Sequence, residues 1–320
     1  MTALFPFVVG CGRSGTTLVR AILDSHPELA VTHESRFVPW MLANRSRFER
    51  AGGVDADRFV DDLFSRRNVA SRVDAWDLGR DRVSAALAAR PPADLPAAIR
   101  AVYELYAADR GKPRYGDKTP GYVLSIDVIG RAFPEAGFVH VVRDGRDVAL
   151  ALRDVDFGPA DLVQAAHTWR AKVLGARAAA RSVGPSRYVE VRYEDLVARP
   201  EDEIRKLCSF IELEFVPGMA EPHRRDGGRD DLDGLGRQDH HASLARPITP
   251  GLRDWRVQMA GSDVRRYDEV AADALADLGY EVTTPRATGA AHRAATLARV
   301  ARGRVVAYSR ARRRSRAGGR

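Results

Sequence analysis

The sequence predicts an α/β fold in which a parallel sheet is flanked by helices. Short apolar segments at 5–9, 137–142 and 188–191 each lead through a glycine-containing or charged turn into a helical pattern. Strands that alternate with helices in this way form parallel sheets whose two faces the helices cover. A fourth apolar stretch at 29–31 predicts another strand, and it places Glu34 at or just beyond the end of that strand.

The first strand leads into the most informative motif of the chain. Residues 10–17 read Gly-Cys-Gly-Arg-Ser-Gly-Thr-Thr, and apolar residues then recur at helical spacing until His26-Pro27. A glycine-rich turn before a helix exposes backbone N–H groups, and the start of the helix adds positive potential, so such a turn holds phosphate or sulfate. The predicted anion site consists of Gly12, Arg13, Ser14, Gly15, Thr16 and Thr17.

The loop has the spacing of a P-loop but lacks its lysine. Gly10 and Gly15 match the Walker pattern, whereas Thr16 stands where that pattern has lysine. The lysine reaches the β- and γ-phosphates, and the hydroxyl after it holds Mg²⁺, so the substitution argues against ATP or GTP hydrolysis. Arg13 instead adds a permanent, forked cation. We therefore expect a P-loop-type sheet that binds a phosphate-rich ligand, with a nucleotide kinase or NTPase as the alternative.

The remaining chain predicts one domain over 1–285 and a separate tail. Polar helices fill a helical insertion at about 36–110, and a long loop is expected at 226–241. The Arg-rich tail at 286–320 contains 11 Arg and no Asp or Glu, and we expect it to be helical or disordered. Without this tail the chain has 40 basic and 43 acidic residues, so the expected domain over 1–285 is not basic.

Composition restricts the cofactors, the compartment and the partners. Cys11 and Cys208 lie too far apart in sequence to suggest a disulfide framework, and we predict no metal. There is no basic leader and no apolar run near the roughly 18 residues of a membrane span, so we expect a cytoplasmic protein. The tail is a candidate for peripheral attachment to an anionic membrane surface. A nucleic-acid or membrane-surface binder is the other alternative class, although no specific nucleic acid is expected.

Several segments resemble one enzyme family. Gly-Cys-Gly-Arg-Ser-Gly-Thr-Thr-Leu at 10–18, followed by Leu-Asp-Ser-His-Pro at 23–27, resembles the 5′-phosphosulfate loop of sulfotransferases dependent on 3′-phosphoadenosine 5′-phosphosulfate (PAPS), particularly the tyrosylprotein sulfotransferase-like branch. The further segments similar to this family, in its order, are 115–120, 141–147, 191–196 and 246–248. The resemblance implies transfer of a sulfuryl group from PAPS to an acceptor hydroxyl, which leaves PAP and a sulfate ester.

The resemblance also assigns cofactor contacts. It implies that Arg143 binds the 3′-phosphate and that Tyr193 and Arg246 contact the cofactor. One position departs from the family, because Ala151 stands where a serine hydroxyl usually joins the arginine on the 3′-phosphate. A hydrogen bond to a charged group contributes roughly 1.5 to 3 kcal/mol, so we expect the 3′-phosphate to be held about tenfold more weakly. We read Arg146 and Asp147 as an ion pair at a helix start.

Sulfuryl transfer needs a base near the acceptor and cations near the bond that breaks. Glu34 lies at the expected carboxyl end of a strand, where open α/β sheets bind ligands, and it matches the family's proposed catalytic carboxylate. His33 is the competing base, and adjacent residues near a strand end point to opposite sides, so one of the two should face the site. We expect Glu34 as the base, Arg13 and Lys118 as charge stabilisers, and Arg36 as partner of Glu34 or of an acidic acceptor. The acceptor itself, whether peptide tyrosine, sugar, lipid or small molecule, stays open.

Overall fold

The computed structural model describes residues 3–65, 73–153, 159, 161–224, 246–249 and 253–285. The chain divides into two compact units. The first comprises Met1–Val142 and Ala176–Pro250, and the second comprises Arg143–Gly175 and Gly251–Arg320. The expected loop at 226–241 and the expected tail at 286–320 lie outside the described residues.

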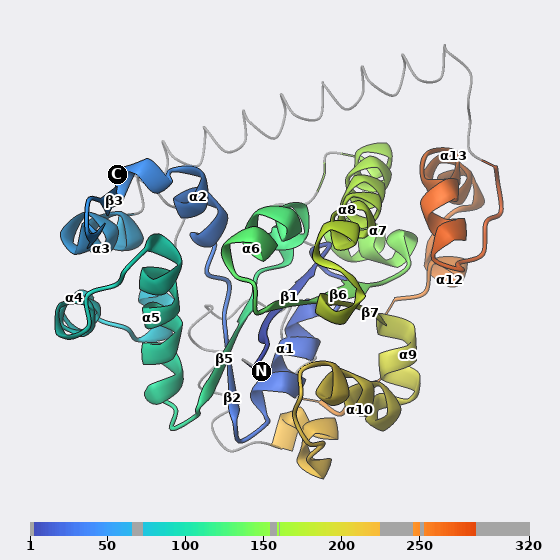
Figure 1. Ribbon diagram of the computed structural model, residues 1–320. Helices are drawn as coiled ribbons and strands as arrows, with labels where there is room; N and C mark the ends of the chain where they lie inside the picture. Colours follow the sequence, from blue (N-terminus) through green and yellow to red (C-terminus); the bar gives the residue numbers. More distant parts are fainter. Residues whose placement is uncertain are drawn as a thin grey trace, which may run out of the picture. The chain divides into compact units, whose positions relative to one another are not determined.

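A five-stranded parallel sheet forms the centre of the first unit (Figure 1), as the sequence predicts. Its strand order is β2-β5-β1-β6-β7. The strands are β1 (Phe5–Gly10), β2 (Leu29–Thr32), β5 (Arg114–Lys118), β6 (Ala136–Val142) and β7 (Tyr188–Arg192). Strand β1 therefore lies in the middle of the sheet, and the glycine-rich loop begins where β1 ends.

Alternate side chains of β1 enter two different hydrophobic cores. Phe5, Phe7 and Val9 pack in a core with residues of α5 (Leu95–Ala108) and α6 (Ile126–Ala132). Val8 packs in another core with residues of α1 (Thr16–Asp24), α9 (Tyr193–Ala198) and α10 (Pro200–Phe210). Because successive strand residues point to opposite faces, the two cores lie on the two sides of the sheet. Helices therefore cover both faces, and the carboxyl edge is left for the loops that carry the candidate site.

Side chains of α1 occupy the outer edge of β2, the last strand on that side of the sheet. Arg20 Nε donates to the Val31 carbonyl at 2.9 Å, and the Val31 N–H donates to Asp24 Oδ1 at 2.8 Å. These contacts satisfy backbone groups that an edge strand would otherwise leave unpaired. They also explain part of the 23–27 motif, because Asp24 ties the end of α1 to the strand that leads to Glu34.

The chain between β2 and β5 is mainly helical and adds to one of the two cores. Its α5 packs against the sheet. The helices are interrupted by a short antiparallel hairpin of β3 (Glu49–Arg50) and β4 (Gly53–Val54). The sequence pattern did not indicate this hairpin. The elements are α2 (Val38–Ala43), η1 (Arg45–Arg47), β3 (Glu49–Arg50), β4 (Gly53–Val54), α3 (Ala56–Phe64), η2 (Val73–Trp76) and α4 (Arg80–Ala89). Short 3₁₀ turns elsewhere in this unit are η3 (Pro120–Leu124), η4 (Pro185–Arg187), η5 (Pro217–Ala220) and η6 (Pro222–Arg224).

Strand β5 is the strand of the five-stranded sheet that the sequence pattern missed. Its residues, Arg-Tyr-Gly-Asp-Lys, show no apolar run, yet it pairs with β2 on one side and β1 on the other. This inner position buries Asp117 and Lys118, which are 0% and 2% exposed. Lys118 is therefore a buried strand residue and not a solvated loop lysine.

The described part of the second unit is helical. It contains α7 (Gly145–Arg153), the first part of α8 (Leu162–Val183), α12 (Trp255–Gln258) and α13 (Gly261–Asp277). Gly145 lies where these helices meet, because an added Cβ would lie 2.1 Å from Tyr267 Oη and 2.5 Å from Trp169 Cδ2. Only glycine fits this close approach. No helix in the described residues is long and apolar enough to cross a membrane.

Candidate active site

The loop between β1 and α1 depends on two glycines and one serine. Gly15 adopts φ 100°, and an added Cβ there would lie 2.4 Å from Tyr193 Cδ2. A Cβ on Gly10 would lie 2.6 Å from the Val141 carbonyl. The single Ser14 hydroxyl donor lies 2.7 Å from the Cys11 carbonyl and 3.0 Å from the Val141 carbonyl, within hydrogen-bonding distance of both. The Ser14 hydroxyl therefore holds the loop to β6 from inside, while glycine lets the loop pass close to its neighbours.

The outer side of the loop is suited to an anion. The first N–H groups of α1, from Thr16 and Thr17 onward, have no partner within the helix. An added Cβ on Gly12 would meet nothing within 4 Å, so there is open space beside this part of the loop. Arg13 stands in the same turn. Backbone donors, a helix start and a guanidinium together fit a phosphate or phosphosulfate group.

Two of the predicted site arginines have unusual backbone conformations. Arg13 has φ 72° and Arg36 has φ 62°, within the left-handed region that non-glycine residues rarely adopt. Among the described residues only Asp77 and Glu212 share this feature without being glycine. Strain of this kind costs about 1 to 3 kcal/mol per residue and tends to occur at functional sites. Both arginines are thus held in place by local structure.

The predicted base and the predicted lysine lie at the same edge of the sheet. Strands β2 and β5 pair so that Thr32 lies opposite Asp117, and Glu34 and Lys118 follow these residues. Glu34 Oε1 is 3.7 Å from Lys118 Nζ, and Glu34 Oε2 accepts hydrogen bonds from Arg36 Nε at 2.9 Å and Nη2 at 2.6 Å. The expected Glu34–Arg36 pair is present, and Lys118 is a second cation on the same carboxylate.

Burial changes the acidity of Lys118. Desolvation lowers the pKa of its amine from 10.5 to about 8, and the nearby cations Arg20 and Arg36 act in the same direction. Glu34 and Asp117 oppose this shift because their negative charges favour the protonated amine. At neutral pH the amine is still mainly protonated, so it can serve as a cation there and lose this role in mildly alkaline solution.

The sequence reasoning missed a buried polar network beneath this pair. Asp117 Oδ2 accepts hydrogen bonds from Tyr103 Oη at 2.8 Å and Thr32 Oγ1 at 3.4 Å. The Ser35 N–H donates to Thr119 Oγ1 at 3.0 Å, and Ser35 Oγ lies 2.7 Å from Tyr122 Oη. Three of the network residues, Ser35, Asp117 and Thr119, are the direct chain neighbours of Glu34 and Lys118. The order Asp117-Lys118-Thr119 could have indicated this network. Side chains alternate along a strand, so Asp117 and Thr119 point to one face and Lys118 points to the other.

Glu34 and His33 differ in their surroundings. The His33 residue is 5% exposed, whereas the Glu34 side chain keeps 23% of its surface exposed while touching Lys118 and Arg36. An acceptor that arrives from solvent therefore finds the Glu34 carboxylate more open than the His33 ring.

The structure places the two remaining cofactor candidates of the first unit in different surroundings. Tyr193 begins α9, and its ring packs against Gly15, so its observed contact is with the glycine-rich loop between β1 and α1. Arg246 is exposed, two residues before Ile248, which packs against the core formed by α1, α9 and α10. The structure does not bring Arg246 into an observed contact with the loop.

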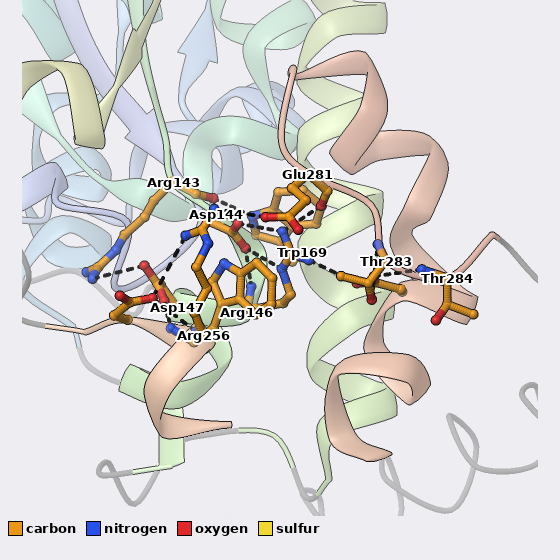
Figure 2. A network of polar contacts seen from close by, with 12 residues as sticks. Arg143, Asp144, Arg146, Asp147, Trp169, Arg256, Glu281, Thr283 and Thr284 are labelled. Carbon is orange, nitrogen blue, oxygen red and sulfur yellow. Dashed lines mark hydrogen bonds and ion pairs between the residues drawn. The ribbon is translucent and has the colours of Figure 1, made fainter. Parts of the chain in front are cut away.

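Arg143 belongs to the second unit and directly follows β6 in the chain. It is 6% exposed, and its Nη2 lies 3.8 Å from Asp147 Oδ2 (Figure 2). Ala151 lies one helical turn after Asp147 on α7 and is 5% exposed. The predicted Arg146–Asp147 pair is wrong: Arg146 Nη2 instead lies 2.8 Å from Asp144 Oδ2, because the Arg146 side chain is buried with Asp144 while Asp147 faces Arg143.

Within the described residues, no group of three or more His, Cys, Asp and Glu could hold a metal ion. This finding leaves the prediction of a metal-free enzyme as a prediction, because part of the chain lies outside the described residues.

The parallel sheet with its glycine-rich loop defines an α/β protein of the P-loop type. A sequence-family model described as the sulfotransferase family matches residues 7–217, and the chain belongs to this family. Family membership favours sulfuryl transfer over the nucleotide-kinase alternative.

Named relatives agree with this assignment. A putative protein-tyrosine sulfotransferase of Caenorhabditis briggsae is 25% identical over 293 residues, which cover 88% of this chain and 90% of the relative. Protein-tyrosine sulfotransferase 2 of Gallus gallus is 28% identical over 285 residues, which cover 86% and 69%. The nodulation protein NoeE of Sinorhizobium fredii is 28% identical over 311 residues, which cover 90% and 68%. The predicted resemblance to the tyrosylprotein sulfotransferase-like branch is thus confirmed.

Solved structures show the same fold. The sulfotransferase domain of the curacin biosynthetic pathway superposes with a TM-score of 0.59 at 19% identity, covering 88% of this chain and 99% of that domain. The sulfotransferase domain of the Synechococcus PCC 7002 olefin synthase gives 0.57 at 22% identity, covering 87% and 94%.

Proposed function

We propose that this sulfotransferase uses PAPS as the sulfuryl donor and an alcohol or phenol as the acceptor, with Glu34 as the general base. The observation that carries the proposal is the Glu34–Lys118 pair, 3.7 Å apart at the carboxyl edge of β2 and β5. Lys118 lies opposite Val8 of β1, two residues before the phosphate loop begins at Gly10. A base and a cation therefore stand at the edge of the sheet where the loop begins.

The loop would hold the 5′ end of the donor. The N–H groups at the start of α1, together with those of Gly12 and Arg13, supply donors for phosphate and sulfonate oxygens. Ser14 and Tyr193 support the loop through the contacts described above. In this proposal Arg143 and Arg246 are further cofactor ligands, with Arg143 directed to the 3′-phosphate.

The reaction requires a proton to leave the acceptor and charge to be stabilised on the leaving group. Glu34 accepts the hydroxyl proton while the acceptor oxygen forms its bond to sulfur and the bond from sulfur to the 5′-phosphate oxygen breaks. Lys118 and Arg13 stabilise the negative charge that grows on that phosphate oxygen. Arg36 holds the second oxygen of Glu34 and so orients the carboxylate. In this proposal its exposed side chain also pairs with an acidic acceptor.

The first acceptor class to test is peptide tyrosine, because several relatives are named protein-tyrosine sulfotransferases. Sugars, lipids and small phenols are the other classes. Residues 286–320 lie outside the described residues, so their attachment to an anionic membrane surface, like a cytoplasmic location, stays a prediction from sequence.

Transfer from ³⁵S-labelled PAPS tests the proposal. The protein is incubated, without added metal, with tyrosine peptides, sugars, lipids and phenols in separate reactions, and labelled product is counted. We expect labelled ester in at least one pool and none with an Arg13→Ala, Lys118→Ala double variant. Phosphate transfer from Mg-ATP in the same pools, without sulfuryl transfer, would overturn the proposal.

A further inference from the structure

Arg146 is the most deeply buried arginine in the described part of the second unit. Its side chain is 0% exposed, and its donors are directed to named acceptors. Nε and Nη2 donate to the two carboxylate oxygens of Asp144 at 3.0 and 2.8 Å. Nη1 donates to Asp268 Oδ1 at 3.3 Å, and Nη2 also donates to the Glu281 carbonyl at 2.8 Å (Figure 2). Burying a guanidinium is costly unless it is paired in this way, so losing one partner would leave a buried charge uncompensated.

The guanidinium of Arg146 also fixes Trp255. Its Cζ lies 3.6 Å from the centroid of the indole ring, in a cation–π contact. The backbone N–H of Trp255 donates to Asp147 Oδ1 at 2.8 Å. Asp147 uses its other oxygen, Oδ2, to approach Arg143 Nη2 at 3.8 Å. Contacts therefore run continuously from Arg146 through Trp255 and Asp147 to the guanidinium of Arg143.

A second set of contacts holds the backbone of the same turn. Trp169 Nε1 donates to the Arg143 carbonyl at 3.1 Å, and the Arg146 N–H donates to Asp144 Oδ1 at 2.9 Å. Trp169 thus fixes one end of the turn while Arg146 fixes the other. The Arg143 side chain projects from a backbone that these contacts hold in one conformation.

Asp268, the second carboxylate partner of Arg146, connects this cluster to the chain after α13. Its Oδ2 accepts hydrogen bonds from the Thr283 N–H at 2.8 Å, the Thr283 hydroxyl at 2.7 Å and the Thr284 N–H at 3.2 Å. Asp268 is itself 0% exposed. Arg146, which lies on α7, is therefore in contact with α12, α13 and the segment that follows α13.

We propose that Arg146 is a positioning residue for the 3′-phosphate: by holding Trp255, and through it Asp147, it keeps Arg143 in its binding conformation. This inference rests on the proposed function, in which Arg143 is the ligand of that phosphate. A long side chain that is already ordered loses less conformational freedom when it binds its ligand. Arg146 accordingly contributes to affinity only for ligands that carry a 3′-phosphate.

The comparison of PAP with adenosine 5′-phosphate (AMP) tests this directly, because AMP lacks the 3′-phosphate. Calorimetry gives the dissociation constants of both ligands for the full-length protein, and their ratio measures the contribution of the 3′-phosphate. Arg146→Lys keeps the positive charge but loses the paired hydrogen bonds to Asp144 and the planar contact with the Trp255 ring. We expect it to reduce the ratio by about fivefold to tenfold, mainly by weakening PAP, with AMP affinity unchanged.

Matched variants separate this role from general stability. Arg170→Lys changes an arginine of the same unit that pairs with Asp273, outside these contacts, and should leave both affinities unchanged. Trp255→Phe keeps the backbone N–H and an aromatic face, so it should give a smaller reduction of the ratio. It also provides the test if Arg146→Lys does not fold.

An unchanged ratio in folded Arg146→Lys, or an equal loss of PAP and AMP affinity, would overturn the inference and leave the proposed function intact. If the wild-type protein binds both PAP and AMP but PAP no more tightly, the assignment of Arg143 fails, and the inference fails with it. If the wild-type protein binds neither ligand, the proposed function fails first.

Discussion

Glu34 presents one carboxylate oxygen to each of two cations: Oε1 lies 3.7 Å from Lys118 Nζ, and Oε2 accepts two hydrogen bonds from Arg36. The two cations differ in exposure, since the Lys118 side chain is 3% exposed and that of Arg36 is 42% exposed. Lys118 is thus the inner cation and Arg36 the outer one. In the proposed mechanism Lys118 accordingly stabilises charge in the site, and Arg36 orients the proposed base.

The acidity of Lys118 predicts an alkaline limit to turnover. Burial lowers the pKa of the amine to about 8, so the cation is lost as the pH rises through this value. We expect turnover to fall in the same range, and we expect Lys118→Arg to lack this fall because guanidinium stays charged. The measurement is the pH profile of kcat.

Lys112→Arg is the control for this experiment, because Lys112 is also buried but donates to the Leu29 carbonyl, away from Glu34. It should keep the wild-type profile. An alkaline fall that persists in Lys118→Arg would show that another group causes it.

Asp117 predicts a pH dependence of stability. Burial raises the pKa of its carboxyl from 3.8 to about 6. A raised folded-state pKa adds stability that is fully present below the unfolded-state value and is lost as the pH rises through the folded-state value. Relative to Asp117→Asn, the wild-type unfolding free energy should therefore fall by on the order of 3 kcal/mol between about pH 4 and pH 7.

Urea unfolding of both proteins at these two pH values measures the effect. Tyr103→Phe removes the hydrogen bond to Asp117 but leaves the titrating carboxyl, so it should keep the pH dependence. Equal pH dependence in wild type and Asp117→Asn would contradict the assignment.

The loop glycines predict two different outcomes. Gly15→Ala places a Cβ against the Tyr193 ring in a left-handed conformation, and we expect a loss of about 1 to 3 kcal/mol in unfolding free energy. Gly12→Ala is the matched control, because its Cβ would meet nothing within 4 Å, and its stability should stay within about 0.5 kcal/mol of wild type. Denaturant unfolding distinguishes them. Similar stabilities of the two variants would mean that the loop can move away from Tyr193.

Ala151 predicts a gain of affinity. The residue lies on α7 one turn beyond Asp147, the partner of Arg143, where a serine hydroxyl would add a donor for a 3′-phosphate. We expect Ala151→Ser to bind PAP about tenfold more tightly, with AMP affinity unchanged. Calorimetry with both ligands is the measurement. An unchanged PAP affinity would indicate that another group already fills this role or that the 3′-phosphate binds elsewhere.

Much of the sheet could be predicted from sequence because four of its strands bury apolar side chains. The expected segments 5–9, 29–31, 137–142 and 188–191 correspond to β1, β2, β6 and β7 within one residue at each end. Strand β5 was not predicted because it has no apolar run. Its buried polar side chains are stabilised by tertiary hydrogen bonds, such as that from Tyr103 to Asp117. Such partners are distant in sequence and leave no periodic pattern.

In the candidate site, too, contacts between residues close in sequence could be predicted, whereas features that depend on tertiary structure could not. Sequence position predicted the Glu34–Arg36 pair, because the two residues are close in the chain and both follow the end of a strand. The burial of Lys118 could not be predicted, because it follows from the inner position of β5. The pairing of Arg146 with Asp144 and Asp268 was missed for a related reason: Asp268 lies on α13, more than 100 residues away in sequence.

Turnover of Glu34→Gln compared with His33→Gln tests the central claim most directly, with PAP affinity measured for each variant. Glutamine keeps the size of Glu34 but removes the basic oxygen, so turnover should fall about 10²- to 10⁴-fold while PAP affinity stays within about twofold. His33→Gln should cost much less in turnover. Near-normal turnover of Glu34→Gln together with inactive His33→Gln would contradict Glu34 as the base.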